Sequence, residues 1–236
     1  MKSFVHRAVF ALAACLVFGT AAAAQEEKKE EYDMGLTQLA LLSRAPDWKA
    51  EAAAPHVEKA QRAYVERLIE DGTAALAGSV AGDGDLREIL VFKTDSTELA
   101  SEWVRNSPAV KAGVLKAEVL KWYVARNYIT PPRRPLARTD YVFGILVRGP
   151  KWTPEETEET KKLQAGHMAN IGRLAKEGKL VLAGPFEDGG ERRGVFIFKA
   201  PTLEEAQRLT DTDPAVAAGR LKIQLHKWSV PEGMLR

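Results

Sequence analysis

An internal duplication is the feature that most constrains the fold of this chain. When Gln61–Trp122 is aligned with His167–Trp228, at a constant offset of 106 residues, 22 of the 62 pairs are identical without a gap. Further upstream, the segment 44–48 matches the segment 148–152 at an offset of 104. Two copies of about 95 residues predict a tandem pair of like domains, because a solenoid needs three or more shorter repeats.

Each copy shows the pattern of a β-α-β-β-α-β unit. In the second copy, apolar runs predict strands, and periodic stretches between a polar cap and a glycine predict helices. We expect Thr153 to cap the first helix, Pro154 to occupy its first position and Gly178 to end it. The predicted elements are a strand at 141–147, a helix within 153–178, strands at 180–183 and 194–198, a helix at 202–210 and a strand at 221–228.

This order of elements predicts an α+β fold. An antiparallel sheet with both helices on one face is a ferredoxin-like unit, whose second face needs cover. Two such βαββαβ units can cover each other, which predicts an intramolecular pseudo-dimer with any pocket between or beside the two sheets. The expected domains are residues 34–124 and 139–230. A linker at 125–138, rich in proline and arginine, is expected to lack regular structure.

The first 24 residues have the layout of a secretory signal peptide. Lys2 and Arg7 precede an uncharged apolar run at 8–20, and small residues end at Ala24. The run is shorter than the roughly 20 residues that a membrane-spanning helix needs. We therefore expect cleavage after Ala24 and a periplasmic or secreted protein.

A bacterial lipoprotein signal is the alternative for the same segment. Leu12–Cys15 fits the lipoprotein box, in which the cysteine is lipidated and becomes the first mature residue. The apolar residues 16–18 that follow favour ordinary cleavage, because lipoproteins usually turn polar after the cysteine. A lipid anchor at Cys15 remains the second hypothesis.

Composition excludes several classes of protein. Cys15 is the single cysteine, so neither an intrachain disulfide framework nor a cluster of thiolate ligands can form. The 34 basic and 32 acidic residues give a net charge of +2, which offers no electrostatic basis for nucleic-acid binding. With 45% hydrophobic residues, the chain has the composition of an ordinary globular protein.

A set of short motifs in the second copy resembles the YCII-related family, which belongs to the dimeric α/β-barrel superfamily. The motifs are Gly166-His167, the run from Gly178 to Phe186, Glu204-Glu205-Ala206, Asp213-Pro214 and Ala218-Gly219. The resemblance covers the second copy well and the first copy, a degenerate YCII-like domain, more weakly. It implies a dimeric α/β-barrel and an active-site pair of His167 and Asp213, with acid/base chemistry of the lyase type.

The first copy provides an internal control on this pair. Gln61 stands where His167 would be and Ser107 where Asp213 would be, so the fold does not require the histidine. Asp213 also precedes Pro214 in the manner of a helix N-cap, a role that serine can fill equally well. A catalytic and a structural role for Asp213 therefore both remain open.

Three further residues are candidates for substrate binding. Gly184 and Pro185 could shape the pocket near His167, and His226 could face the cavity between the sheets. Leu120 stands at the position of His226 in the first copy, which favours a structural role there. The scattered histidines lack the short spacing of a metal site, and we expect no metal and no cofactor.

Two hypotheses follow for function. In the first, the second copy is a cofactor-independent acid/base lyase or isomerase acting on a small molecule, with His167 and Asp213 as catalytic residues. In the second, the pseudo-dimer is an exported ligand-binding or interaction module without catalysis. Neither requires nucleic acid or a membrane span, and the sequence leaves the oligomeric state and the substrate open.

Overall fold

The computed structural model describes residues 32–46, 55–132 and 137–236. The predicted signal segment, including Cys15, lies outside the described residues, and so does the middle of the predicted linker. None of the helices in these ranges is long and apolar enough to cross a membrane.

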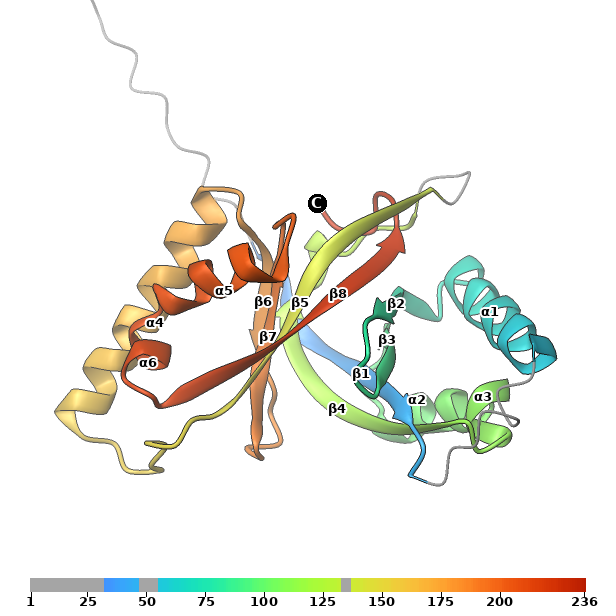
Figure 1. The fold of residues 1–236 in the computed structure, drawn as a ribbon, viewed down its shortest axis with the longest axis horizontal. Coiled ribbons are helices and arrows are strands. Elements are labelled where there is room, and N and C mark those ends of the chain that lie inside the picture. Colours follow the sequence, from blue (N-terminus) through green and yellow to red (C-terminus); the bar gives the residue numbers. More distant parts are fainter. Residues whose placement is uncertain (1–31, 47–54, 133–136) are drawn as a thin grey trace, which may run out of the picture. The chain divides into compact units, whose positions relative to one another are not determined.

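The two halves of the described chain repeat one order of elements (Figure 1). The first half contains β1 (Met34–Arg44), α1 (Pro55–Glu70), β2 (Ala74–Ala81), β3 (Leu86–Phe92), α2 (Thr97–Arg105), α3 (Pro108–Lys111) and β4 (Leu115–Ala125). The second half contains β5 (Arg138–Arg148), α4 (Glu158–Lys176), β6 (Leu180–Pro185), β7 (Arg192–Phe198), α5 (Leu203–Asp211), α6 (Pro214–Ala217) and β8 (Leu221–Pro231).

These eight strands form one antiparallel sheet in the order β4-β1-β3-β2-β8-β5-β7-β6. The halves join where β2 pairs with β8, with Ser79 opposite Ser229. At the two outer strands, Trp122 of β4 forms an isolated bridge with Phe186, and its indole Nε1 donates to the carbonyl of Gly184 at 3.1 Å. The sheet is thereby nearly closed, and the predicted α+β fold, two ferredoxin-like units forming an intramolecular α/β-barrel, is confirmed.

Side-chain alternation along each strand separates an interior face from a helix-covered face. On β5, Phe143 and Ile145 belong to the core shared with the first half, whereas Val142 and Leu146 pack in a separate cluster beneath the helices of the second half. Phe143 meets the fully buried Trp228 edge-on, with ring centroids 5.3 Å apart. The second half therefore has a cluster on its helix side that is separate from the core shared with the first half.

The first helix of the second half begins later than the sequence pattern predicts. Thr157 caps α4 in a capping box: its hydroxyl accepts from the backbone N–H of Thr160, whose side chain accepts from the N–H of Thr157. The predicted cap, Thr153, instead accepts a hydrogen bond from Arg220. The prediction of Thr153 with Pro154 as the helix start was wrong: Thr153 and Glu156 have the usual sequence of a capping box, but the box forms one turn later, between Thr157 and Thr160.

A glycine follows the long helix in each half. Gly178, just after α4, has a φ of 67°, and Gly72, just after α1, has a φ of 78°. This left-handed conformation favours glycine and satisfies the last helical carbonyls. The predicted end of the helix at Gly178 is confirmed.

The predicted linker is more regular than expected where the structure describes it. A 3-10 turn occupies Arg126–Tyr128 directly after β4. Ile129 then forms a bridge with Leu235, and the N–H of Thr130 donates to the carbonyl of Met234 at 3.0 Å. The C-terminal segment thus pairs with the start of the linker, a long-range contact that local composition could not reveal.

Candidate active site

His167 lies on the face of α4 that packs against the sheet. Its imidazole stacks on Phe196 of β7, with ring centroids 5.7 Å apart and planes inclined by 14°. The residue is 9% exposed, so it is buried without being sealed from solvent. A histidine held flat on a strand residue has a fixed ring plane, which is a requirement for directed proton transfer.

Asp213 is the partner of this imidazole. Its Oδ2 lies 2.6 Å from His167 Nδ1, and its Oδ1 accepts the backbone N–H of Ala215 at 2.8 Å. Asp213 is therefore both the cap of α6 and the partner of the histidine, so the two roles left open by the sequence coexist. The structure brings the two predicted residues together across 46 positions of sequence.

The electrostatics of the pair favour a charged aspartate. Asp213 is completely buried, and burial alone would raise the pKa of its carboxyl. The hydrogen bond and charge of His167, together with the N–H groups of Ala215 and Val216, outweigh this effect and hold the pKa below its ordinary value. An anionic Asp213 orients the imidazole so that Nδ1 carries its proton and Nε2 is available as a base.

A cavity of about 940 Å³ adjoins His167 on the helix side of the sheet. Its wall comes from α4, from the sheet and from the loop before α4, and one residue of the first half, Met34, contributes to it. Residues that define it are Leu146, Trp152, His167, Ile171, Phe196 and Leu221. Its volume lies in the upper part of the range for small-molecule sites.

Three arginines surround the indole of Trp152 in this wall. The guanidinium carbons of Arg193, Arg220 and Arg148 lie 4.5, 4.9 and 5.3 Å from a ring centroid of that indole. Burial, with the nearby charge of Arg148, lowers the pKa of Arg193. Like charges held this close favour the binding of an anion, which would relieve their repulsion.

Sequence reasoning missed this arginine cluster. Its members are dispersed over β5, β7 and the start of β8, and each alone is an ordinary charged residue. One signal was available: Arg148 and Arg193 recur in the first copy as Arg44 and Arg87. Other charged positions, such as Lys93 and Lys199, are also kept in both copies, so this signal alone could not single out the cluster.

The predicted substrate-binding residues separate into two groups. Gly184 and Pro185 at the end of β6 line the cavity. Gly184 also lies against β4, where a Cβ would come within 2.1 Å of the carbonyl oxygen of Tyr123. These two residues therefore lie both at the site and at the contact between the halves.

His226 does not line the cavity. It is paired with Phe143 across β5 and β8, so both side chains face the barrel interior, opposite the helix side that holds His167. Burial lowers the pKa of His226. The alternation of β8 was correctly predicted, and His226 faces the space between the sheets as expected, but the cavity beside His167 lies on the other face of the sheet. A role of His226 in substrate binding stays a prediction.

The fold is like that of dimeric α/β-barrel proteins. Among solved structures, a variant of chlorite dismutase from Candidatus Nitrospira defluvii is similar with a TM-score of 0.53 and 11% identity, covering 84% of this chain and 92% of that one. A heme-binding protein from Thermus thermophilus has a TM-score of 0.51 and 14% identity, with 84% and 91% covered. At these identities the likeness concerns the fold.

Sequence relationships define the family more closely. Residues 147–228 match the YCII-related domain. The uncharacterized protein YjpA of Bacillus subtilis (strain 168) is 35% identical over 66 residues, which cover 28% of this chain and 75% of that protein. The chain belongs to the YCII-related family, and the match falls on the half that carries His167 and Asp213.

Proposed function

We propose that the second half is a cofactor-independent acid/base enzyme that acts on a small anionic molecule. The observation that carries this proposal is the 2.6 Å contact between His167 Nδ1 and Asp213 Oδ2 in the wall of a cavity that also presents three arginines. A fixed base and a group of cations in one cavity can bind an anion and move a proton within it.

Each residue has a defined part in this chemistry. Asp213 accepts a hydrogen bond from Nδ1–H, which fixes the tautomer of the neutral ring with its lone pair on Nε2, and Nε2 has no hydrogen-bond partner among the described residues. Nε2 removes a proton from a carbon or hydroxyl of the bound molecule, and the resulting imidazolium is stabilised by Asp213. The same proton is returned to the leaving group in an elimination, or to another atom of the product in an isomerisation. The arginines balance the negative charge that develops on the substrate.

Exchange of a substrate C–H proton with solvent tests the proposal without requiring the full reaction. Small 2-oxo acids and hydroxy acids are incubated in D₂O with the protein, and deuterium incorporation is followed by NMR. We expect exchange with the wild type, a loss of about 10²-fold or more with His167→Gln, and weaker binding with Arg193→Gln. Gln is the residue of the first copy at this position, so the fold should tolerate it.

The opposite result is equally clear. If wild type and His167→Gln bind the acids identically and neither catalyses exchange, the catalytic proposal is wrong. The second half is then a ligand-binding module, which was the other hypothesis from the sequence.

Haem binding is a second candidate function, because two structurally similar proteins are a chlorite dismutase and a heme-binding protein. The residues present fit the group: a histidine whose Nδ1 is held by a carboxylate is a well-oriented metal ligand, and arginines can pair with the haem carboxylates. Bound haem would supply redox chemistry. His167 would hold the iron, and Arg148, Arg193 and Arg220 would hold the carboxylates.

The two candidates exclude one another, because His167 Nε2 cannot be both a free base and an iron ligand. Titration with hemin, followed by the Soret absorption, distinguishes them. Stoichiometric binding that His167→Ala abolishes would favour haem. A spectrum unchanged between wild type and His167→Ala would leave the acid/base function as the candidate.

We also propose that the protein is exported, on the basis of the signal-like layout of residues 1–24. N-terminal sequencing of protein recovered from the periplasm is expected to begin at Gln25. A lipidated Cys15 would support the lipoprotein alternative, and cytosolic protein that retains Met1–Lys2 would contradict export.

A further inference from the structure

The first half contains a cavity at the place that corresponds to the candidate active site. It measures about 670 Å³ and lies between α1 and the sheet. At the offset of 106, its lining residues Gln61, Leu90 and Ala109 correspond to His167, Phe196 and Ala215 of the other cavity. The loss of the His/Asp pair has therefore not filled the site.

A different hydrogen-bonded pair occupies this cavity. Gln61 Oε1 accepts the backbone N–H of Ala109 at 3.0 Å, and Gln61 Nε2 donates to Glu88 Oε2 at 2.7 Å. In the second half the same helix N–H donates to Asp213, which contacts His167. A helix amide, a connecting group and a titratable group in the cavity wall thus recur in both halves.

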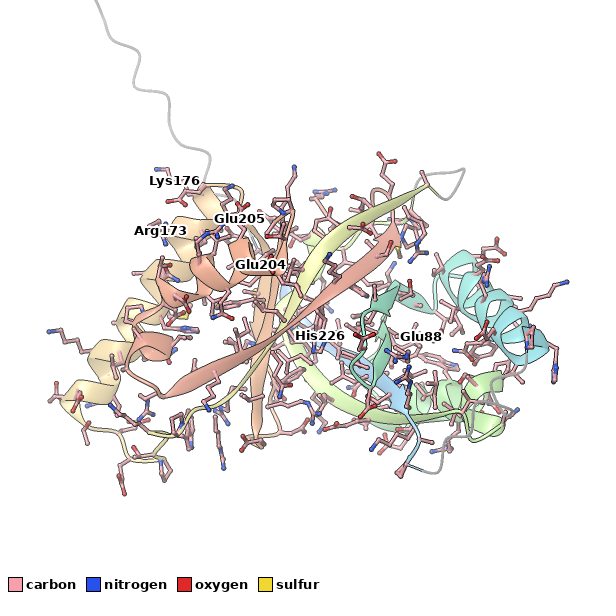
Figure 2. The ribbon with its side chains drawn as sticks, in the orientation of Figure 1. Glu88, Arg173, Lys176, Glu204, Glu205 and His226 are labelled. Atoms are coloured by element: carbon pink, nitrogen blue, oxygen red, sulfur yellow. The ribbon has the colours of Figure 1, made fainter. Side chains whose placement is uncertain are left out.

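The residues that differ between the two cavities differ together. Gln61 takes over the helix N–H that Asp213 accepts in the other half, and the hydroxyl of Ser107 is left buried without a hydrogen-bond partner among the described residues. Glu88, labelled in Figure 2, occupies the position of Gly194. A carboxyl group has therefore been introduced at a position that is a glycine in the second half.

Glu88 is half-buried on β3, and its Oε1 has no hydrogen-bond partner among the described residues. Burial raises the pKa of this carboxyl, and the hydrogen bond from Gln61 offsets the effect in part. A protonated Glu88 would present an O–H donor to the cavity.

The remaining charges of the cavity come from four elements. Arg44 lies on β1, Arg87 on β3 and Arg138 on β5, while α1 contributes one arginine and two glutamates, Arg62, Glu58 and Glu66. The position of Arg138 at the start of β5 corresponds to that of Met34 at the start of β1. Each half thus contributes the first residue of its first strand to the cavity of the other half, and in this cavity that residue is a cation.

We propose that the cavity of the first half is a second binding site, for a small organic acid with an apolar body. Its carboxylate accepts a hydrogen bond from protonated Glu88 and pairs with Arg138. Its apolar body packs on Val57, Val65 and Leu90, which line the same cavity. A carboxylic acid and a carboxylate share one proton more favourably than two charged carboxylates can coexist, so binding is strongest at low pH.

Benzoate is a suitable probe, and benzamide is its uncharged counterpart. The full chain is labelled with ¹⁵N, and the side-chain amide of Gln61 and the backbone amide of Ala109 are followed during titration. We expect saturable shifts of both signals with benzoate, and a several-fold loss of affinity as the pH is raised above the ordinary carboxyl range and Glu88 ionises. Benzamide should show no such dependence on pH.

Two variants separate the contributions of Glu88 and Arg138 to benzoate binding. Glu88→Gln keeps an uncharged donor, so benzoate should still bind and its affinity should no longer change with pH, even though Glu58 and Glu66 remain. Arg138→Met introduces the residue of the other cavity and should weaken benzoate at every pH while the spectrum otherwise retains its dispersion.

Three outcomes would overturn the proposal. They are no saturable binding at about 10 mM benzoate, ten times a 1 mM dissociation constant, shifts confined to Phe196 and Ala215, or a pH dependence that Glu88→Gln leaves intact. Shifts at Phe196 and Ala215 would concern the cavity of the second half, so this test does not depend on the proposed enzyme function.

Discussion

At the scale of single residues, Asp213 shows how one side chain can serve structure and chemistry together. One of its carboxylate oxygens caps α6 and the other contacts His167. The resemblance to the YCII-related family located the pair, but the sequence could not decide between the two roles. Both follow from the same fact, that a helix start and an imidazole lie on opposite sides of one buried carboxylate.

Replacing Asp213 by Asn or by Ala should separate these roles. Asn can still accept from Ala215, so the fold should lose about 1 kcal/mol, whereas Ala leaves a buried N–H unpaired and should cost about 1–3 kcal/mol. Only the carboxylate fixes the proton on His167 Nδ1, so both variants should change the ¹⁵N shifts of the ring nitrogens. Urea denaturation and NMR of the imidazole measure the two effects. A ring tautomer unchanged in both variants would show that Asp213 is a cap alone.

The same carboxyl should make the free energy of unfolding depend on pH in the acidic range. The pKa of Asp213 is below its ordinary value of 3.8 in the fold, so its charged form stabilises the folded state at neutral pH. This contribution is lost as pH falls through and below that value. The free energy of unfolding should fall more steeply toward low pH in the wild type than in Asp213→Asn.

His226 should make the free energy of unfolding depend on pH in a higher range than Asp213 does. Burial lowers its pKa from 6.5, so the fold favours the neutral ring and the unfolded chain binds a proton first as pH falls. Stability is therefore complete above the ordinary histidine range and decreases below it. His226→Leu, which copies Leu120 of the first half, should remove this decrease in urea denaturation between about pH 7 and pH 5. If the stability of His226→Leu depends on pH as that of the wild type does, another group titrates in this range.

At the scale of elements, the sequence predicted the strands and helices well and the boundaries less well. The spacing of apolar residues and the positions of glycines are local properties of the sequence, so they predicted the order of elements and the end of α4. The start of α4 depended on which of two threonines completes a capping box. The arginines around Trp152 and the pairing of Gln61 with Glu88 require long-range register, which one sequence does not contain.

Alternation also explains why His226 lies apart from His167. It predicts which residues of β8 share a face, and Ile223 and Leu225 do pack with the helix-side cluster. It does not predict which face borders a cavity. In this barrel both cavities lie on the helix side, and the interior is filled by aromatic and aliphatic side chains.

Two equivalent glycines allow the strands of different halves to approach. A Cβ on Gly184 would come within 2.1 Å of a backbone oxygen of β4, and one on Gly78 within 2.4 Å of the carbonyl of Ser229. Gly184→Ala and Gly78→Ala should each destabilise the protein by about 1–3 kcal/mol through overpacking. Gly172→Ala on α4 meets no atom within 4 Å and should instead stabilise by up to about 1 kcal/mol. Thermal denaturation of the three variants compares them, and equal melting temperatures would contradict the close approach.

At the scale of the molecule, the nearly closed sheet should make the described chain unfold as one unit. The large core includes residues of both halves, with Trp122 and Trp228 fully buried in it. Trp122→Ala should cost about 3–5 kcal/mol and lower the stability of both halves together. Probes in each half, such as amide exchange at Leu90 and Phe196, should report one transition. Two separate transitions would show that the halves fold independently.

Met34 and Arg138 each line the cavity of the other half, and this arrangement bears on how such a protein can evolve. In a dimer of identical subunits, a mutation at the first strand would alter both binding sites at once. Joining the subunits into one polypeptide removes this coupling, so that one site can acquire a positive charge while the other keeps a thioether. Fusion would in this way have permitted an ancestral pair of identical sites to specialise for different molecules.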